Sequence, residues 1–283
     1  MKERLTKRIF VLPMAWLLSI VLIRGQMLCA QETAQEAADR TLKLAQAAQN
    51  PVANMISVPF QNNFNFGMGE EDKMGWTLNI QPVIPMTLNN KWNLISRIVT
   101  PITYQPELTE GSKDYFGLGD INPQFYFATT SGKLIWGIGP QLTFPTASDE
   151  HLGAEKFSAG PGAVALVMKG RWVYGTLVNQ QWSYAGDDDR RKVSVMLIQP
   201  FVNYNLPKGW YVGCSPMITA NWAAYQDKNI WTVPLGGGAG KIFRIGRLPV
   251  NAQLGAYYNV EKPDGAADWQ LRFQVQLLFP VKK

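Results

Sequence analysis

The chain has 283 residues, of which 46% are hydrophobic and 17% charged, and its formal net charge at pH 7 is +6. Residues 1–30 carry five of the 27 basic and one of the 21 acidic residues, so their removal lowers the charge to +2. This remainder argues against nucleic acid as a partner, because nucleic-acid-binding proteins concentrate positive charge on one face. Only Cys214 lies beyond residue 30, so a chain cut there can form no intramolecular disulfide.

Residues 1–30 have the order of a secretory signal peptide: a basic start, an apolar run over residues 9–23, and Ala30 at the expected cleavage site. Arg24 after the apolar run is atypical of such a signal. Two alternatives stay open. An uncleaved anchor helix is one, although the run is short for a span. A lipoprotein acylated at Cys29 is the other, although the preceding residues fit that cleavage poorly. We expect export and cleavage after Ala30.

Residues 31–53 are rich in Ala, Gln and Glu. Thr33 and Glu36 have the spacing of a helix capping box and predict a short periplasmic helix. The apolar stripe of this helix is thin, with Ala38, Leu42 and Ala45. The helix could plug or gate a lumen, dock a partner, or simply be a solvated segment.

Residues 54–283 read as about twelve alternating apolar and polar segments, each with the roughly 9–11 residues that a tilted membrane strand needs. Their connections alternate in length. The long ones are 67–75, 105–115, 147–156, 185–192, 223–229 and 260–267. The tight ones are 88–91, 129–132, 169–171, 206–209 and 244–247.

Charge follows the same alternation. Acidic residues occupy the long connections: Glu70, Glu71, Asp72, Glu107, Glu110, Asp114, Asp149, Glu150, Glu155, Asp187, Asp188, Asp189, Asp227, Glu261 and Asp264. The tight ones contain no acid and hold Lys91, Lys169, Arg171, Lys208, Arg244 and Arg247. Transmembrane β-barrels have short periplasmic turns and longer extracellular loops. The sequence therefore predicts an all-β protein, a transmembrane antiparallel up-and-down barrel of about twelve strands in a Gram-negative outer membrane.

The faces of the segments agree with this prediction, because a membrane strand shows lipid and lumen with period two. In the last segment Trp269, Leu271, Phe273, Val275, Leu277 and Phe279 oppose Gln270, Arg272, Gln274 and Gln276. Aromatic residues near segment ends suit interfacial girdles. A soluble sandwich or lipocalin-like barrel also alternates, but about twelve strands are too many for one filled soluble barrel.

Ten prolines fall inside the expected strands, where each removes a ladder hydrogen bond. They are Pro59, Pro82, Pro85, Pro101, Pro123, Pro140, Pro200, Pro216, Pro234 and Pro249. We expect them at bulges or at strand ends near the rim.

Residues that carry chemistry are sparse. His151, the only histidine, lies in a long connection beside Asp149 and Glu150, which leaves little for a Ser-His-Asp arrangement or a histidine metal site. The glycine run 236–240 lacks a flanking βαβ pattern and reads as a strand. The run 187–189 could bind divalent cations or bridge lipopolysaccharide through them, and is otherwise a solvated loop. We expect no enzymatic activity, metal or cofactor.

Two strand residues stand out by their charge. Asp120 is the acid that falls in a strand segment, and its parity places it on the lumen face, as it does Arg97 in the preceding segment. A charge facing lipid costs about 2–4 kcal/mol near the midplane, which favours the lumen. The candidate lumen or constriction residues are Arg97, Asp120, Gln124, Gln141 and Arg272. They could select solutes or form an internal ion pair that staples the barrel.

The remaining inferred lumen residues are mostly neutral, so the lining suits uncharged or mixed solutes. Barrels of about eight strands are filled, whereas those of sixteen or more hold open channels. A narrow, partly plugged conduit is expected.

Five motifs resemble one outer-membrane family in order along the chain: GLGDI (117–121), GPQLTFPTAS (139–148), VNQQWSYAG (178–186), QPFVNYNL (199–206) and WTVPLGGGAGKIF (231–243). This is the family labelled "meta-pathway of phenol degradation". The resemblance implies a transporter-type barrel for aromatic or other hydrophobic compounds and transfers no individual site residue. The ending departs from outer-membrane barrels in general, because residues 280–283 follow Phe279, which we expect to serve the barrel assembly machinery.

The sequence thus predicts an outer-membrane channel for passive uptake of small solutes. Its expected partners are outer-membrane lipid, lipopolysaccharide, the assembly machinery and a small-molecule solute. A non-transporting structural or surface-interaction barrel is the alternative, and an enzymatic barrel is a third.

Overall fold

A computed structural model describes residues 35–108 and 113–279. The expected signal peptide, Thr33, Glu110 and residues 280–283 lie outside this description. A helix spans residues 35–49, which confirms the expected N-terminal helix. Residues 44–283 form one compact unit, so the last turn of this helix belongs with the strands. Within the described ranges, no helix is both long enough and apolar enough to cross a bilayer.

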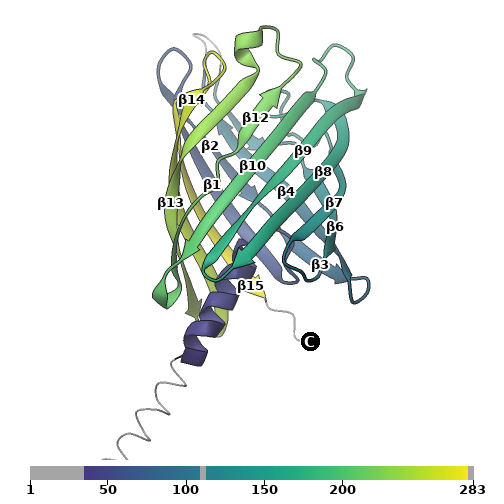
Figure 1. The fold of residues 1–283 in the computed structure, drawn as a ribbon. Helices are drawn as coiled ribbons and strands as arrows, with labels where there is room; N and C mark the ends of the chain where they lie inside the picture. Colours follow the sequence, from purple (N-terminus) through teal and green to yellow (C-terminus); the bar gives the residue numbers. More distant parts are fainter. Residues whose placement is uncertain (1–34, 109–112, 280–283) are drawn as a thin grey trace, which may run out of the picture. The chain divides into compact units, whose positions relative to one another are not determined.

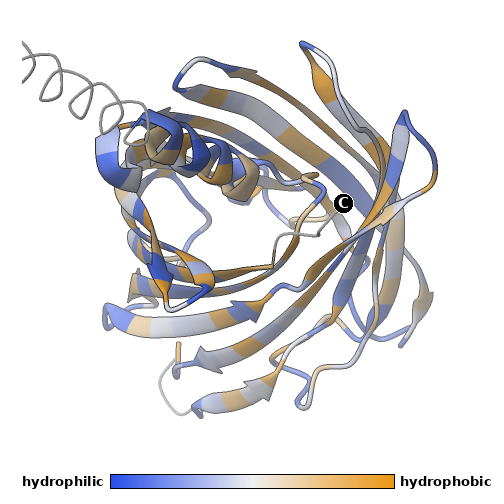
Figure 2. Ribbon diagram, turned by 90° about the horizontal axis from the view of Figure 1, so that it is seen from below, coloured by the Kyte–Doolittle hydropathy of each residue, from blue (hydrophilic) through white to orange (hydrophobic). Residues whose placement is uncertain are grey.

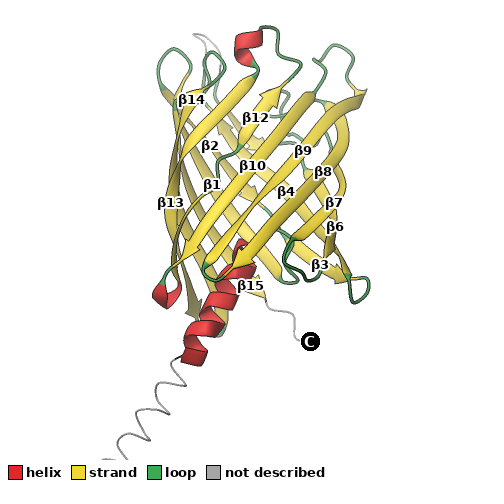
Figure 3. Ribbon diagram, viewed as in Figure 1, coloured by secondary structure: helices red, strands yellow, loops and turns green. Residues whose placement is uncertain are grey.

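The strands form a barrel of twelve antiparallel spans, as the sequence predicts (Figure 3). Three spans are each divided into two strands: β2 with β3, β5 with β6, and β11 with β12. The strands are β1 (Ile56–Met68), β2 (Lys73–Ile80), β3 (Val83–Thr87), β4 (Trp92–Gln105), β5 (Tyr115–Leu118), β6 (Asn122–Thr129), β7 (Ile135–Thr143), β8 (Lys156–Lys169), β9 (Trp172–Gly186), β10 (Ser194–Asn205), β11 (Trp210–Cys214), β12 (Ile218–Asn221), β13 (Trp231–Ile245), β14 (Leu248–Glu261) and β15 (Trp269–Phe279).

The barrel closes between the first and last strands. β1 pairs with β15 from Ile56 opposite Phe279 to Phe66 opposite Trp269. Closure pairs the backbone groups that a sheet edge would expose, and the hydrocarbon interior of a membrane requires this. Short turns lie at one end of the barrel and longer connections at the other (Figure 1).

The two faces of the wall differ as the period-two pattern predicts. In β15, Trp269, Phe273 and Phe279 are exposed on the outer face, whereas Arg272 and Gln276 are buried on the lumen face. Hydrophobic and hydrophilic residues alternate along the strands in Figure 2. A barrel with this polarity suits a lipid surround and not water.

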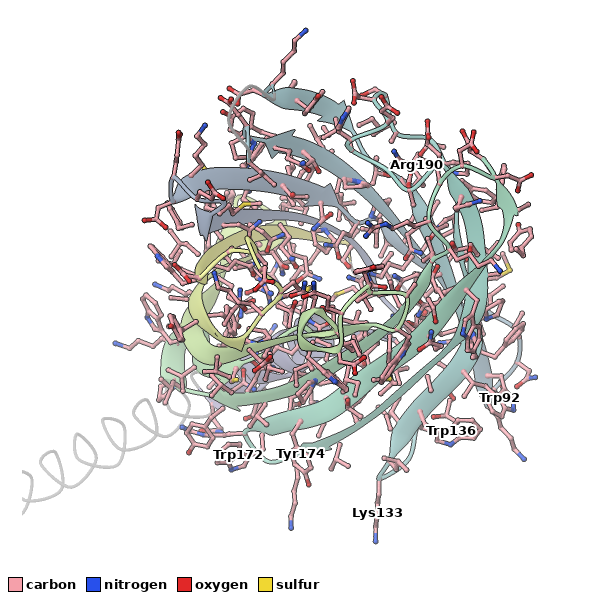
Figure 4. All side chains as sticks on the ribbon, turned by 90° about the horizontal axis from the view of Figure 1, so that it is seen from above. Trp92, Lys133, Trp136, Trp172, Tyr174 and Arg190 are labelled. Carbon is pink, nitrogen blue, oxygen red and sulfur yellow. The ribbon has the colours of Figure 1, made fainter. Side chains whose placement is uncertain are left out.

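Aromatic pairs mark the outer wall near the strand ends. Trp92 meets Trp136 edge to face at 5.3 Å between ring centroids, and Trp222 meets Trp231 at 5.5 Å. Trp92, Trp136, Trp172 and Tyr174 point away from the barrel in Figure 4. Trp and Tyr at such positions suit membrane interfaces, since one part of each ring system is apolar and another is polar.

The prolines fall partly where we expect them. Pro82 separates β2 from β3, and Pro216 separates β11 from β12. Pro123 and Pro249 are second residues of their strands, and a register shift lies beside Pro234.

The expectation is wrong for Pro59, Pro85, Pro101, Pro140 and Pro200, which lie in unbroken strands. For three of them the reason is a break in the neighbouring strand. Pro59 faces the break between β2 and β3, Pro101 the break between β5 and β6, and Pro200 the break between β11 and β12. At these points the neighbouring strand accepts no hydrogen bond from a backbone N–H group, so proline, which lacks this group, is tolerated.

Candidate functional site

Three of the candidate residues lie side by side on the lumen wall. Arg97 of β4 is opposite Gln124 of β6, and Gln124 is opposite Gln141 of β7. The amide of Gln124 donates to Asn122 Oδ1 at 2.6 Å, and the amide of Gln141 donates to the Tyr126 hydroxyl at 2.5 Å. Both glutamines are buried. They are therefore packed into the wall, and Arg97 is the charged member of the row.

Arg97 donates through Nη2 to the amide oxygen of Gln81, in the connection between β2 and β3. Gln81 is itself buried and lies in the break between β2 and β3, next to Pro82. The guanidinium is thus held by a neutral side chain.

Arg272 lies on the lumen face of β15 and is 6% exposed. Its guanidinium donates to Asn63 Oδ1 at 3.2 Å, to Gln270 Oε1 at 3.0 Å and to the Ser215 carbonyl at 2.9 Å. Its Cζ lies 4.7 Å from the centroid of the Tyr257 ring. The carbonyl of Ser215 falls in the break between β11 and β12. A break in the wall thus supplies one of the groups that hold this side chain.

Asp120 has a different role. It lies in the connection between β5 and β6, where its carboxylate accepts the backbone N–H groups of Ala147 at 3.2 Å and Ala154 at 2.7 Å. Within the described ranges, no ion pair joins Asp120 to Arg97 or Arg272. Asp120 therefore fastens the connection between β7 and β8, and does not line the lumen cavity.

The lumen holds a cavity of about 160 Å³ that both arginines line. Its polar lining is Gln49, Asn50, Ser57, Gln61, Gln81, Arg97, Gln199, Asn203, Ser215, Asn251, Gln253, Arg272, Gln274 and Gln276. Its apolar lining is Ala47, Ala48, Pro51, Ala53, Met55, Pro59, Val83, Leu177 and Phe201, with Tyr211 beside them. None of the lining residues is acidic.

Residues 44–55 pack into the lumen at the turn end, and we call them the plug segment. Val52 is 3% exposed, in a cluster with apolar residues of β4 and of β6 to β10, among them Ile95, Tyr126 and Phe201. Ala45 and Met55 pack against lumen-facing side chains of the opposite wall, Tyr211, Ile242 and Leu278. Apolar contacts thus hold the plug segment against two sides of the lumen wall.

Amide contacts fix the plug segment. The side chains of Gln49 and Asn205 donate to each other at 3.0 and 3.1 Å. The amide of Gln46 donates to the Gly170 carbonyl at 2.9 Å, and Asn50 Oδ1 accepts the Val52 N–H at 2.9 Å. The sequence left plugging of the lumen open as one of three possibilities for this segment and did not identify which residues dock. A signal was present in Ile95, Leu177 and Phe201, which are apolar residues of lumen parity near the turns.

The connections at the other end are braced by ion pairs. Lys73 Nζ lies 3.0 Å from Glu71 and 3.3 Å from Glu107, and Arg190 Nε lies 3.3 Å from Glu155. Arg190 also donates to the Gly153 carbonyl at 2.9 Å, and Figure 4 shows it among the connections. The acids of the long connections are therefore partly neutralised.

His151 stacks on Tyr115 with ring centroids 4.0 Å apart, and its Nδ1 lies 2.8 Å from Asp149. The backbone N–H of His151, followed by its ring, lowers the pKa of the Asp149 carboxyl. The nearby Ser148 hydroxyl bonds to the Leu118 backbone. The polar groups around His151 therefore make contacts that hold the connections together.

No family model and no curated protein matches the chain. Solved structures do. The crystal structure of the COG4313 outer membrane channel from Pseudomonas putida F1 is similar with a TM-score of 0.62 at 17% identity, over 81% of this chain and 97% of that one. The NanC porin follows with a TM-score of 0.49 at 9% identity, over 79% of this chain and 100% of that one. The translocator domain of autotransporter NalP from Neisseria meningitidis has a TM-score of 0.45 at 12% identity, over 89% of this chain and 98% of that one. The first likeness shows that the chain has the fold of an outer-membrane channel.

Proposed function

We propose that the protein is a channel in the Gram-negative outer membrane for passive uptake of small solutes, apolar or aromatic ones included. The observation that carries the proposal is the lumen cavity, which lies inside a closed wall and is lined by amides and two arginines. The motifs that resemble the phenol-degradation family support the aromatic part of the proposal.

The plug segment makes this channel a gated one. Its apolar contacts hold residues 44–55 inside the turn end of the lumen, so a shift of these residues would widen the path for a solute. The strand ladders hold the wall independently of these contacts, which lets the plug segment move while the barrel stays closed.

The remaining assignments follow from the proposed location. The N-terminal signal would deliver the chain to the periplasm, and Phe279 would serve the barrel assembly machinery. Outer-membrane lipid would contact the outer wall, and lipopolysaccharide the acidic connections.

Efflux from liposomes tests the channel. Folded protein, identified by its heat-modifiable mobility, should release entrapped small neutral solutes faster than protein-free liposomes and should retain large polysaccharides. Equal rates with and without folded protein would reject the channel.

The plug segment at the turn end also favours a second candidate, a non-transporting barrel whose braced acidic connections contact the surroundings. This candidate predicts phenotypes that follow deletion of residues 185–192, and none from substitution of Arg97. Substitution of Arg97 that changes solute uptake would exclude it.

We propose no enzymatic activity. A lipid-hydrolysis assay checks this: activity in the wild type that is lost in His151→Ala would contradict it.

A further inference from the structure

The lumen cavity has an uncompensated positive charge. Arg97 and Arg272 both line it, and no Asp or Glu is among the lining residues. The acids of the described strands and connections lie at the long connections or at the strand ends beside them, except for Asp120 between β5 and β6, whose carboxylate accepts two backbone N–H groups. Glu36 and Asp39 lie in the helix. A cavity of one sign inside a low-dielectric wall concentrates its field, so an anion inside would be stabilised.

The contacts of the arginines leave this charge unbalanced. Arg97 donates to the Gln81 amide oxygen, and Arg272 donates to two amide oxygens and one carbonyl. These neutral acceptors satisfy donors but do not cancel the charge. Buried charges in proteins are normally paired with an opposite charge, because removing an ion from water is costly. The missing counter-charge is a place for a ligand.

The rest of the lining limits what this ligand can be. The lining also contains apolar side chains, among them Met55, Val83, Leu177 and Phe201. Its volume of about 160 Å³ suits a small molecule. A ligand that satisfies both parts of the lining has an apolar body and one anionic group.

We propose that the cavity binds a small monoanion with an apolar body, such as a monocarboxylate, that is attracted by the charges of Arg97 and Arg272 and whose anionic group contacts one of these two guanidinium groups. This proposal rests on the proposed channel, through which the ligand would reach the cavity, and it specifies the class of solute. Arginine presents a planar fork of donors that matches a carboxylate. The acidic connections do not oppose it, because several are ion-paired and the remainder act through solvent with a screening length of about 8 Å at physiological salt.

Equilibrium binding to the folded, full-length protein in detergent micelles tests the proposal. The probes are benzoate and benzamide, which have the same shape and differ in charge. Calorimetric titration should show benzoate binding at least tenfold more tightly than benzamide. Arg97→Gln and Arg272→Gln should each weaken benzoate binding, because each removes a positive charge from the cavity, and the variant that removes the direct charge-assisted contact should weaken it about tenfold to a hundredfold. Benzamide binding should change little.

Arg247→Gln is the matched control, because Arg247 is an exposed residue in the turn between β13 and β14. It should bind benzoate as the wild type does. Equal affinities of the wild type for the two probes, or equal losses in the control and the lumen variants, would overturn the proposal. If a glutamine variant fails to fold, Arg97→Lys and Arg272→Lys keep the charge and should retain preference for benzoate. Loss of that preference in folded lysine variants would count against it.

Binding does not require passage, which separates this proposal from the channel itself. Benzoate binding without any efflux from liposomes would reject the channel and keep the anion site. Efflux of neutral solutes, with no preference for benzoate over benzamide in binding, would keep the channel and reject the anion site.

Discussion

Truncation of Val52 should loosen the plug segment and leave the barrel wall intact. Val52 is 3% exposed and packs among lumen-facing residues of β4 and of β6 to β10. Val52→Ala removes about two buried methylene equivalents, or roughly 1.6 kcal/mol, and the cavity left behind adds to this. Each 1.4 kcal/mol is a factor of about ten in an equilibrium. The population of the undocked plug segment should therefore rise roughly tenfold to fiftyfold.

Hydrogen exchange of the folded protein measures this population directly. The amides of residues 44–52 should exchange roughly tenfold to fiftyfold faster in Val52→Ala, whereas amides of the strand ladders should not change. Efflux of a neutral solute from liposomes should rise in parallel. Val260→Ala is the control, because Val260 lies at the extracellular end of β14 and is 52% exposed. Unchanged exchange in Val52→Ala, or equal changes in the two variants, would refute the reasoning.

Three further changes test other contacts. Asn205→Ala removes the reciprocal amide pair with Gln49 and should raise exchange of the plug segment several-fold; unchanged exchange would deny that the pair holds it. Contacts with His151 lower the pKa of Asp149. These contacts should therefore stabilise the connection between β7 and β8 fully at pH values above the ordinary carboxyl pKa, and should be lost as the pH falls through the lowered pKa. Limited proteolysis from neutral to acid pH should show later cleavage in the wild type than in Asp149→Asn, and identical profiles would contradict this. Asp120→Asn should speed cleavage between β7 and β8 without changing benzoate binding, whereas tighter binding would place the Asp120 carboxylate in the lumen, where it would repel the anion.

Much of the fold followed from the sequence because a membrane barrel is encoded locally. The alternation of residues such as Trp269 and Arg272 along a strand shows which face meets lipid. The lengths of the connections show which of them lie at the same end of the barrel, and the acids occur in the long ones. These features need no knowledge of distant contacts. Strand breaks were harder to place, because Pro101 is compatible with an unbroken strand only through the gap in its neighbours β5 and β6.

The site was only partly predictable for a related reason. Arg97, Gln124 and Gln141 share a row because strand register brings them together, and their parity already placed them inside. Asp120 has the same apparent parity, but the chain leaves the sheet between β5 and β6, and its carboxylate turns to the amides of a connection far along the chain. The docking of Val52 depends on apolar residues of several strands at once, and such a cluster is visible only after the barrel is closed.

Single-channel recording in planar bilayers tests the central claim, a gated channel, most directly. The wild type should give discrete conductance steps with a low open fraction, and Val52→Asp, which puts a carboxylate into the apolar cluster around the plug segment, should give the same step size with a much higher open fraction. Silence from both proteins, each shown to be folded by heat-modifiable mobility, would contradict the account.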